Sequence, residues 1–308
     1  MTGDDQASTD PAPGRTAAVR AILDVLRCPV CMATFTLVGG VLRCPQRHSF
    51  DLARQGYVSL LHGASGTLRA DTAAMIDARD RVHGAEVFAP LINTLTDRTT
   101  PVITAAASGH PVLVDAGAGA GHYLRAVTQA ATAADPTRQP RPLGIDLSKA
   151  GARAMLRGRP SISAVIGDVW QGLPVADHSA TVVLSVFAPR NVADFARVLA
   201  ADGALFVVHP RADHLGEIVS AMGMLAVGDA KSARVHDSVG EHFDIVDEYA
   251  LTYRRALDAR TVADLAGMGP SAFHLAADEI ADTARSLVGD STIDVTVSVT
   301  LTVCRPRR

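Results

Sequence analysis

The sequence lacks any apolar run of the roughly 18 uncharged residues that a transmembrane helix needs, so it predicts no membrane-spanning helix and no membrane partner. The first residues, MTGDDQASTDPAPGRTAA, are polar and small, and they lack the basic and hydrophobic segments of a secretory signal peptide. We interpret residues 1–18 as a disordered tail and expect a cytoplasmic protein.

A strong net charge is also missing. The chain has 29 Lys and Arg residues against 32 Asp and Glu residues, for a formal net charge of −3. Such a balance neither supports nor excludes a nucleic-acid partner, so any basic footprint has to be local. Few acids oppose a group of arginines near the N-terminus: Arg27, Arg43, Arg47, Arg54 and Arg69. This bias indicates either a phosphate-contacting surface or an ordinary solvated face.

Cysteine is scarce, with four residues in 308, but three of them stand close together. They form the pattern C-x2-C-x12-C-x3-H with Cys28, Cys31, Cys44 and His48. Without a secretion signal, clustered cysteines favour metal ligation over disulfides. Zinc takes four such ligands in a tetrahedron, and four protein ligands leave no open position, so the pattern predicts a structural zinc. Gly39-Gly40 predicts a hairpin turn that brings the two ligand pairs together. We interpret Cys304 as a core thiol.

After this segment the sequence predicts alternating strands and helices. The stretch PVLVDAGAGAGHYLRAVTQA has the form of a buried strand, a glycine-rich turn and a helix, and further strands follow in GIDLS, SISAVIGDVW, SATVVLSVFAPRN and GALFVVHP. This alternation predicts an α/β fold with a parallel sheet covered on both faces. Two late strands, FDIVDEYALTYRRAL and STIDVTVSVTLTVCR, alternate with period two and predict an antiparallel addition at one edge. Helical spacing is also present from Asp71 to about Thr96 and from His214 to about Val227.

The loop after the first buried strand carries Gly117, Gly119 and Gly121 and suits either a dinucleotide or S-adenosylmethionine. Asp146 ends the next strand, where a carboxylate accepts hydrogen bonds from ribose hydroxyls, and Asp168 follows the third strand, where it suits the base of an adenosine. Asp115 directly precedes the loop. A carboxylate there favours a ligand with an ammonium and a sulfonium over one with phosphates, so the methyl donor is preferred over NAD.

These motifs together resemble the bacterial 23S ribosomal RNA guanine-N1 methyltransferases, the RlmA/TlrB family. The resemblance runs from about residue 24 to the C-terminus and is carried by LRCPVC, LRCPQRHSFDLARQGYVSLL, DTAAMIDAR, VDAGAGAGHYL, GIDLSKAGAR, VFAPRN, HPRADHL and MGPSAFH. VFAPRN and VSVTLTVCRP are closer to the actinobacterial macrolide-resistance branch. The sequence departs from the family in the alanines of its glycine loop and in LAADGAL, where many relatives have a Pro-Gly turn.

The resemblance implies a class I Rossmann-like methyltransferase sheet with a small N-terminal zinc-ribbon-like domain that recognises RNA. We expect a zinc domain over 19–62, a linker and helix over 63–100, and an S-adenosylmethionine-dependent domain over 101–308. The family also implies a homodimer, hairpin 35 of 23S rRNA as substrate, and, for the resistance branch, guanine 748 as target with a contribution to tylosin-type macrolide resistance.

Residue roles are expected as follows. The cofactor would contact Asp115, Ala116, Gly117, Gly119, Gly121, His122, Asp146, Asp168 and Val169. The target base would lie near the loop after the fourth strand, where Phe187 stacks, Arg190 holds a phosphate and Asn191 hydrogen-bonds guanine. Each of these three also has an ordinary interpretation, as a core side chain, a surface residue and a helix cap. His209 and His274 are candidate bases for the proton on guanine N1.

Three other interpretations remain open from the residues. The first is a methyltransferase for a small molecule, with the zinc unit serving dimerisation or covering the site. The second is an RNA-binding protein without activity, against which the presence of Asp115 and Asp146 argues. The third is an NAD-dependent enzyme, which predicts no binding of the methyl donor.

Overall fold

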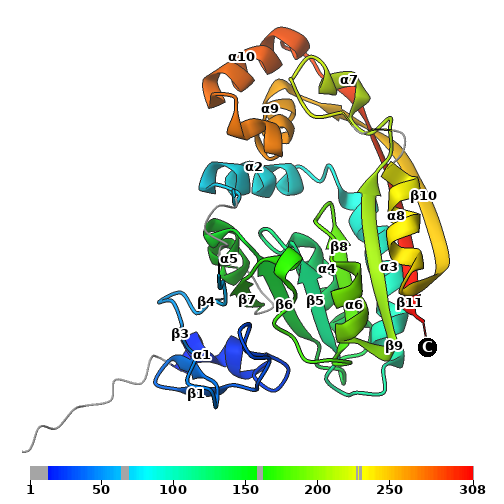
Figure 1. The fold of residues 1–308 in the computed structure, drawn as a ribbon. Helices are drawn as coiled ribbons and strands as arrows, with labels where there is room; N and C mark the ends of the chain where they lie inside the picture. Colours follow the sequence, from blue (N-terminus) through cyan, green and yellow to red (C-terminus); the bar gives the residue numbers. More distant parts are fainter. Residues whose placement is uncertain (1–12, 64–68, 158–161, 227, 229–230, 308) are drawn as a thin grey trace, which may run out of the picture.

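The computed structural model describes residues 13–63, 69–157, 162–226, 228 and 231–307. Its centre is an eight-stranded sheet with the order β10-β11-β9-β8-β5-β6-β7-β4 (Figure 1). In chain order these strands are β4 (Val58–Ser59), β5 (Val112–Ala116), β6 (Arg141–Asp146), β7 (Ser163–Ile166), β8 (Ala180–Val186), β9 (Leu199–Pro210), β10 (Phe243–Leu257) and β11 (Ile293–Pro306). The run from β9 to β4 is parallel, whereas β11 is antiparallel to both β9 and β10. This confirms the α/β class and the antiparallel addition at one edge.

The strand order reverses at the centre of the sheet. From β5 the chain proceeds through β6 and β7 to one side, and then returns to place β8 and β9 on the other side. Ligands of open α/β sheets bind at the carboxyl ends of strands at such a switch point. The glycine loop directly follows β5, so the topology places it there.

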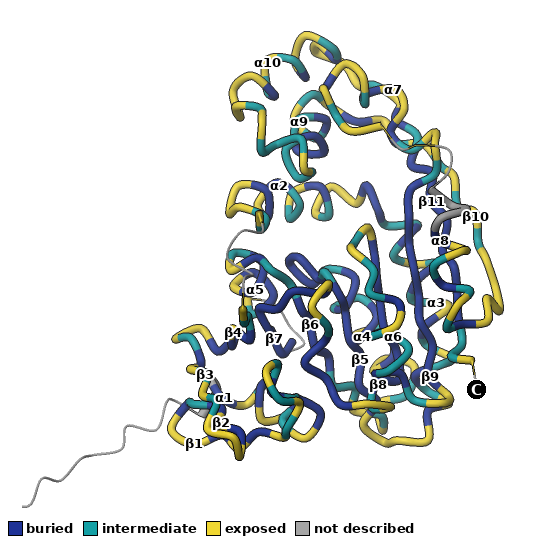
Figure 2. The backbone as a smooth tube through the Cα atoms, in the orientation of Figure 1, coloured by how far each residue is buried: buried dark blue, intermediate teal, exposed yellow. Residues whose placement is uncertain are grey.

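Helices cover both faces of the sheet, and Figure 2 shows the buried strands between them. On β5, Leu113 joins one hydrophobic cluster, while Val112 and Val114 join the other. The helices are α1 (Pro13–Arg20), α2 (Ala73–Gly84), α3 (Ala89–Ala105), α4 (His122–Ala134), α5 (Lys149–Leu156), α6 (Val192–Val198), α7 (Gly216–Val219), α8 (Lys231–Gly240), α9 (Ala259–Gly267) and α10 (Ala277–Val288), with short 3-10 helices η2 (Val169–Gln171) and η3 (Pro270–Phe273). Within the described part of the chain, no helix is long and apolar enough to cross a bilayer.

The expected N-terminal zinc domain is present, and it packs directly on the large sheet. It contains a three-stranded sheet of β1 (Thr36–Val38), β2 (Val41–Arg43) and β3 (Ser49–Asp51). Its last strand, β4, pairs with β7, and Leu26 forms a bridge with Val175. Its buried Leu26 and Leu42 belong to the same hydrophobic cluster as one face of the large sheet. Hydrophobic packing therefore continues between the zinc domain and the large sheet across the expected boundary at residue 62.

Two other expected boundaries fall inside helices. Residues 13–18 of the expected tail lie in α1, which packs on β7 through Val19, while residues 1–12 lie outside the described residues. The boundary at 100/101 cuts through α3, which packs against α4, β8 and β9 and therefore belongs to the methyltransferase fold. The buried Leu91, Leu95 and Ile103 of α3 explain this packing.

Two expected helices also differ. The stretch from Asp71 to Thr96 forms two helices, α2 and the start of α3, because the backbone turns at Glu86 (φ 57°). Thr72 caps α2 by accepting a hydrogen bond from the Met75 backbone N–H at 3.3 Å. The helix expected over 214–227 is reduced to α7, which covers four residues. Left-handed backbone at Leu215 and Gly223 limits it.

Candidate functional site

The four expected zinc ligands converge in the N-terminal segment. The Cys28 and Cys44 sulfurs lie 3.5 Å and 3.3 Å from His48 Nδ1, and the Cys31 and Cys44 sulfurs are 3.7 Å apart. All four ligand atoms lie within 4.8 Å of one another. Sulfurs bound to zinc at about 2.3 Å in a tetrahedron are about 3.8 Å apart, so the geometry fits zinc. With all four ligands supplied by protein, the site is structural.

Each ligand pair is held by a tight backbone turn. Met32 donates to the Cys28 carbonyl at 2.8 Å, and Arg47 donates to the Cys44 carbonyl at 3.0 Å. Both Met32 and Arg47 adopt the left-handed region that closes such turns. Gly39 and Gly40 (φ 58° and 79°) form the expected hairpin turn between β1 and β2. The hairpin therefore brings together two preformed ligand pairs.

The glycine loop joins β5 to α4 with left-handed backbone at Gly117, Gly119 and Gly121 (φ 84°, 54° and 77°). Only glycine adopts these angles without strain. The Gly117 and Ala118 amides donate to the Ile145 carbonyl, and Gly121 is the residue before the first turn of α4. A Cβ on Gly117 would lie 2.5 Å from the Ala188 Cβ. The loop is thus folded tightly against both β6 and the segment after β8.

Three carboxylates surround this loop. Asp146 accepts hydrogen bonds from the Gly119 amide at 2.8 Å and the Ser148 amide at 2.7 Å, and Asp168 accepts one from the Trp170 amide at 3.0 Å. Asp115 is 1% exposed, and its Oδ2 atom has no hydrogen-bond partner among the described residues. Burial, and secondarily the nearby Asp146 carboxylate, raises the pKa of Asp115 to about 8. An orphaned buried carboxyl oxygen beside the loop suits a cationic ligand group.

A cavity of about 540 Å³, which we call the glycine-loop cavity, opens at the carboxyl ends of the strands. Of the expected site residues, it is lined by Gly117, Gly119, Asp146, Asp168, Val169 and Phe187. Asp115, Ala116, Gly121 and His122 are not in the lining. Asp115 and Ala116 are buried in β5, and Gly121 packs against Met155 and Ile162. The cavity therefore joins the glycine loop to the segment after β8.

An aromatic wall of the cavity escaped the sequence analysis. The Phe187 ring lies 5.9 Å from Phe88, 6.4 Å from Tyr123 and 5.8 Å from His214, between ring centroids. All four rings line the cavity, as does His83. These five rings, with His83 included, come from five separate segments, and no local sequence pattern connects them. Phe187 itself adopts a left-handed backbone (φ 54°) and is 40% exposed.

Two histidines lie beside this wall as stacked rings. His83 and His122 have centroids 4.0 Å apart and planes 12° apart, and His122 Nε2 lies 2.8 Å from the Asp80 carboxylate. Burial, with His122 and Arg79 nearby, lowers the pKa of His83 to about 2. His83 is therefore neutral at physiological pH and contributes an uncharged ring to the cavity. His122, an expected cofactor contact, pairs with Asp80 and lies outside the cavity lining.

Arg79 supplies a cation in the cavity lining beside the glycine loop, and the sequence did not indicate it. Its guanidinium lies 2.8 Å from the Asp71 carboxylate and donates to the Met268 carbonyl at 2.9 Å. A Cβ on Gly119 would lie 2.7 Å from Arg79 Nη1. A segment that the sequence analysis treated as a linker and helix thus contributes directly to the cavity.

The residues expected around the target base divide into two groups. Phe187 lines the cavity with Ala188 and Pro189, but Arg190 and Asn191, where the chain enters α6, do not. Asn191 caps α6, because its side-chain oxygen accepts a hydrogen bond from the Asp194 backbone N–H. Its side-chain nitrogen donates to the Val169 and Trp170 carbonyls. His209 is fully buried in β9 opposite Thr300, and His274 follows η3 outside the lining. Strand pairing and capping hold these side chains away from the cavity.

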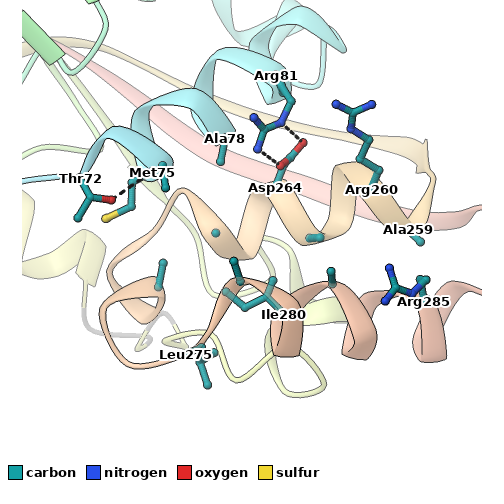
Figure 3. A pocket seen from close by; sticks show the side chains of 16 residues that line it. Thr72, Met75, Ala78, Arg81, Ala259, Arg260, Asp264, Leu275, Ile280 and Arg285 are labelled. Carbon is teal, nitrogen blue, oxygen red and sulfur yellow. Dashed lines mark hydrogen bonds and ion pairs between the residues drawn. The ribbon is translucent and has the colours of Figure 1, made fainter. Parts of the chain in front are cut away.

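A second cavity of about 640 Å³ lies between α2, α9 and α10. Figure 3 shows its small apolar side chains and the Arg81 guanidinium facing the Asp264 carboxylate. Arg81 donates two hydrogen bonds to Asp264, at 2.9 and 2.6 Å. This pair fixes α2 from its outer side, while Arg79 and His83 on the same helix line the glycine-loop cavity.

The donor set fits S-adenosylmethionine. Asp115 is buried outside the cavity lining and directly before the loop, so its carboxyl suits the ammonium group as a nearby negative charge rather than as a lining contact. Of the lining residues, Asp146 suits the ribose hydroxyls, and Asp168 with the Val169 backbone suits the adenine. Arg79 suits the carboxylate at the methionine end. The three carboxylates around the loop would repel a pyrophosphate, and this repulsion argues against a dinucleotide ligand.

The raised pKa of Asp115 predicts proton release when the cofactor binds. At pH 7 the cofactor-free protein keeps Asp115 protonated, because its pKa is about 8, and an ammonium beside it favours the ionised form. We expect affinity for S-adenosylhomocysteine to rise between pH 6 and 8. Calorimetry in buffers of different ionisation enthalpy measures the protons released. Asp115→Asn should abolish the release, and a wild-type protein that releases none would contradict the assignment.

Comparisons with known proteins show the family to which the chain belongs. The family model for the RlmA N-terminal zinc ribbon matches residues 26–62. The 23S rRNA (guanine(748)-N(1))-methyltransferase of Streptomyces fradiae is 39% identical over 92% of this chain and 98% of its own. A relative from Micromonospora griseorubida, provisionally assigned as a 23S rRNA (guanine-N(1)-)-methyltransferase, is 41% identical over the same shares. Among solved structures, the YcgJ protein of Bacillus subtilis matches 70% of this chain and 99% of its own, with 16% identity and a TM-score of 0.45. The chain belongs to the family of 23S rRNA (guanine-N1)-methyltransferases.

Proposed function

We propose that this protein transfers a methyl group from S-adenosylmethionine to N1 of a guanine in hairpin 35 of 23S rRNA, at position 748. One observation carries the proposal. A cavity with the donor set for the methyl donor continues into an aromatic wall, in a chain 39% identical to a relative named for guanine 748. The zinc segment on the same chain completes the arrangement expected for an RNA substrate.

The proposed reaction is an in-line displacement. S-adenosylmethionine, when bound, would supply a methyl group activated by its sulfonium. The bond from guanine N1 to the methyl carbon would form as the bond from that carbon to sulfur breaks. Because N1 carries a proton in neutral guanine, that proton leaves to a base or to water. N1 lies on the Watson–Crick edge, so the guanine has to be unpaired and turned out of its stack.

The aromatic wall is suited to hold such a base. Phe88, Tyr123 and Phe187 present flat apolar surfaces on which a guanine can stack, and the neutral His83 adds no charge that would repel a cationic methyl donor. Holding N1, carbon and sulfur in line is itself a large part of the catalysis. We therefore assign these side chains to orienting the base rather than to proton transfer.

We propose that the zinc segment, residues 26–62, binds the RNA. Arg43, Arg47 and Arg54 are exposed on it and suit phosphate contacts. Because the segment packs into the same cluster as the sheet, RNA bound there would have a fixed position relative to the cavity. We further propose that the protein acts in the cytoplasm as a homodimer and contributes to resistance to tylosin-type macrolides.

Primer extension across hairpin 35 tests this function, using rRNA from cells with and without the gene. N1 methylation blocks base pairing, so reverse transcriptase should stop at guanine 748 only when the gene is present. A gene-dependent stop at a neighbouring guanine would keep the enzyme class and change the target. No gene-dependent stop, despite confirmed expression, would overturn the rRNA target and favour a small-molecule methyltransferase. Comparing tylosin susceptibility of the same strains tests the resistance role.

A further inference from the structure

Trp170 is the only tryptophan of the chain, and its side chain is exposed at the rim of the glycine-loop cavity. The residue is 62% exposed, whereas Val169 before it is 5% exposed and packs in the core. Successive residues of a 3-10 helix point about 120° apart. The indole therefore points away from the direction in which Val169 is buried, toward solvent at the mouth of the cavity.

The backbone that carries this indole is fixed from two directions. Asp168 caps η2 by accepting from the Trp170 amide at 3.0 Å. The Asn191 amide donates to the Val169 carbonyl at 3.1 Å and to the Trp170 carbonyl at 3.2 Å. Three hydrogen bonds thus hold a short helix that exposes the largest aromatic side chain in the protein. A single exposed apolar residue is unremarkable on a surface, but a rigidly presented one beside a ligand cavity is a preorganised contact.

We propose that Trp170 stacks on an unpaired nucleotide next to the target guanine when the rRNA binds. This inference rests on the proposed function. A guanine presented to the cavity by its Watson–Crick edge has left its stack, so its neighbour also loses a stacking partner. An indole at the rim replaces that partner, since an aromatic ring stacks on any base. Phe187 serves the target base inside the cavity, and Trp170 serves the adjacent base outside it.

The neighbourhood of Trp170 suits a nucleotide. Arg190 directly precedes Asn191, whose side-chain amide donates to the Trp170 carbonyl. The Arg190 side chain is half-buried, and it forms none of the ion pairs found in the described part of the chain. Its guanidinium is thus available to a phosphate. The phosphate role expected of Arg190 is compatible with its absence from the cavity lining, because the phosphates of a bound RNA would lie outside the cavity.

Because Trp170 is the only tryptophan, fluorescence excited at a wavelength that tyrosine does not absorb reports on it alone in the unmodified protein. The full-length protein, saturated with S-adenosylhomocysteine, is titrated with an RNA oligonucleotide of hairpin 35 and, in parallel, with a fully paired RNA of equal length. We expect the hairpin to quench the emission and the paired RNA to leave most of it unchanged. Emission that responds to S-adenosylhomocysteine but not to the hairpin would overturn the proposal and assign Trp170 to the adenine.

Variants test the contribution to affinity, measured by anisotropy of labelled hairpin RNA. Trp170→Ala should weaken hairpin binding roughly ten- to hundredfold, and Trp170→Phe should keep most of the affinity. Val246→Ala, at an exposed apolar residue on the edge strand β10, is the matched control and should bind like the wild type. Calorimetry should show unchanged affinity of Trp170→Ala for S-adenosylhomocysteine. Wild-type affinity of this variant for the hairpin would overturn the proposal.

This failure is distinguishable from failure of the proposed function. If the wild-type protein neither binds nor methylates hairpin 35, the function itself is wrong, and the inference about Trp170 falls with it. If the wild type binds and methylates the hairpin while Trp170→Ala does both equally well, only the stacking role is wrong.

Discussion

Replacing Asp146 with alanine is expected to reduce methyl transfer by about 100-fold or more. The Asp146 carboxylate accepts the Gly119 and Ser148 amides, so it both shapes the glycine loop and faces the cavity where the ribose would lie. A hydrogen bond to a charged group contributes about 1.5–3 kcal/mol, and removal leaves two N–H groups without their acceptor. The cofactor contact and the loop conformation are therefore lost together.

The measurement is single-turnover methylation of hairpin 35 RNA, with calorimetry for S-adenosylhomocysteine. Asp146→Asn keeps the shape and removes the charge, so it should retain more of the fold than alanine while still weakening cofactor binding. The exposed Asp290→Ala is the control for loss of one acid and should behave like the wild type. Cofactor affinity of Asp146→Ala within a few-fold of the wild type would contradict the placement of the ribose.

Loss of zinc is expected to have the second large effect, on stability and on RNA binding together. Cys44 is buried, and its sulfur lies close to both Cys31 and His48, so Cys44→Ser opens the tetrahedron. Because the same segment packs into one face of the sheet, its loosening exposes part of the main core. We expect a loss of a few kcal/mol, seen as a melting temperature lower by about 5–10 °C.

Metal analysis, calorimetric melting and anisotropy with hairpin RNA measure this effect. Treating the wild type with a strong chelator should reproduce the changes in Cys44→Ser. Cys304→Ala provides a matched control, since Cys304 is a buried thiol outside the cluster. It should lose some stability from the core while keeping one zinc per chain. A Cys44→Ser protein that still carries stoichiometric zinc would argue against the four-ligand site.

The zinc domain could be predicted from the sequence, but its shared packing with the large sheet could not. A ligand pattern such as C-x2-C-x12-C-x3-H describes local geometry, and it identified the cluster without help from the rest of the fold. It contains no information on where Leu26 and Leu42 are buried, so the shared core with the sheet was missed. In the same way, apolar spacing from Asp71 onward indicated helix but not the turn at Glu86 that separates α2 from α3.

The sequence by itself determined the features that depend on neighbouring residues: the zinc ligands, the left-handed glycines of the loop, the acid at the end of β6, and the alternation that defines an α/β sheet. Only the tertiary structure decided which side chains meet. The aromatic wall combines Phe88, Tyr123, Phe187 and His214 from separate segments, and Arg79 reaches the glycine loop from a helix that precedes β5. Conversely, Asn191 and His209 have plausible residue types but are held elsewhere by capping and strand pairing. The physical reason is that backbone geometry and ligand spacing are local, whereas cavity walls form by long-range packing that sequence periodicity does not encode.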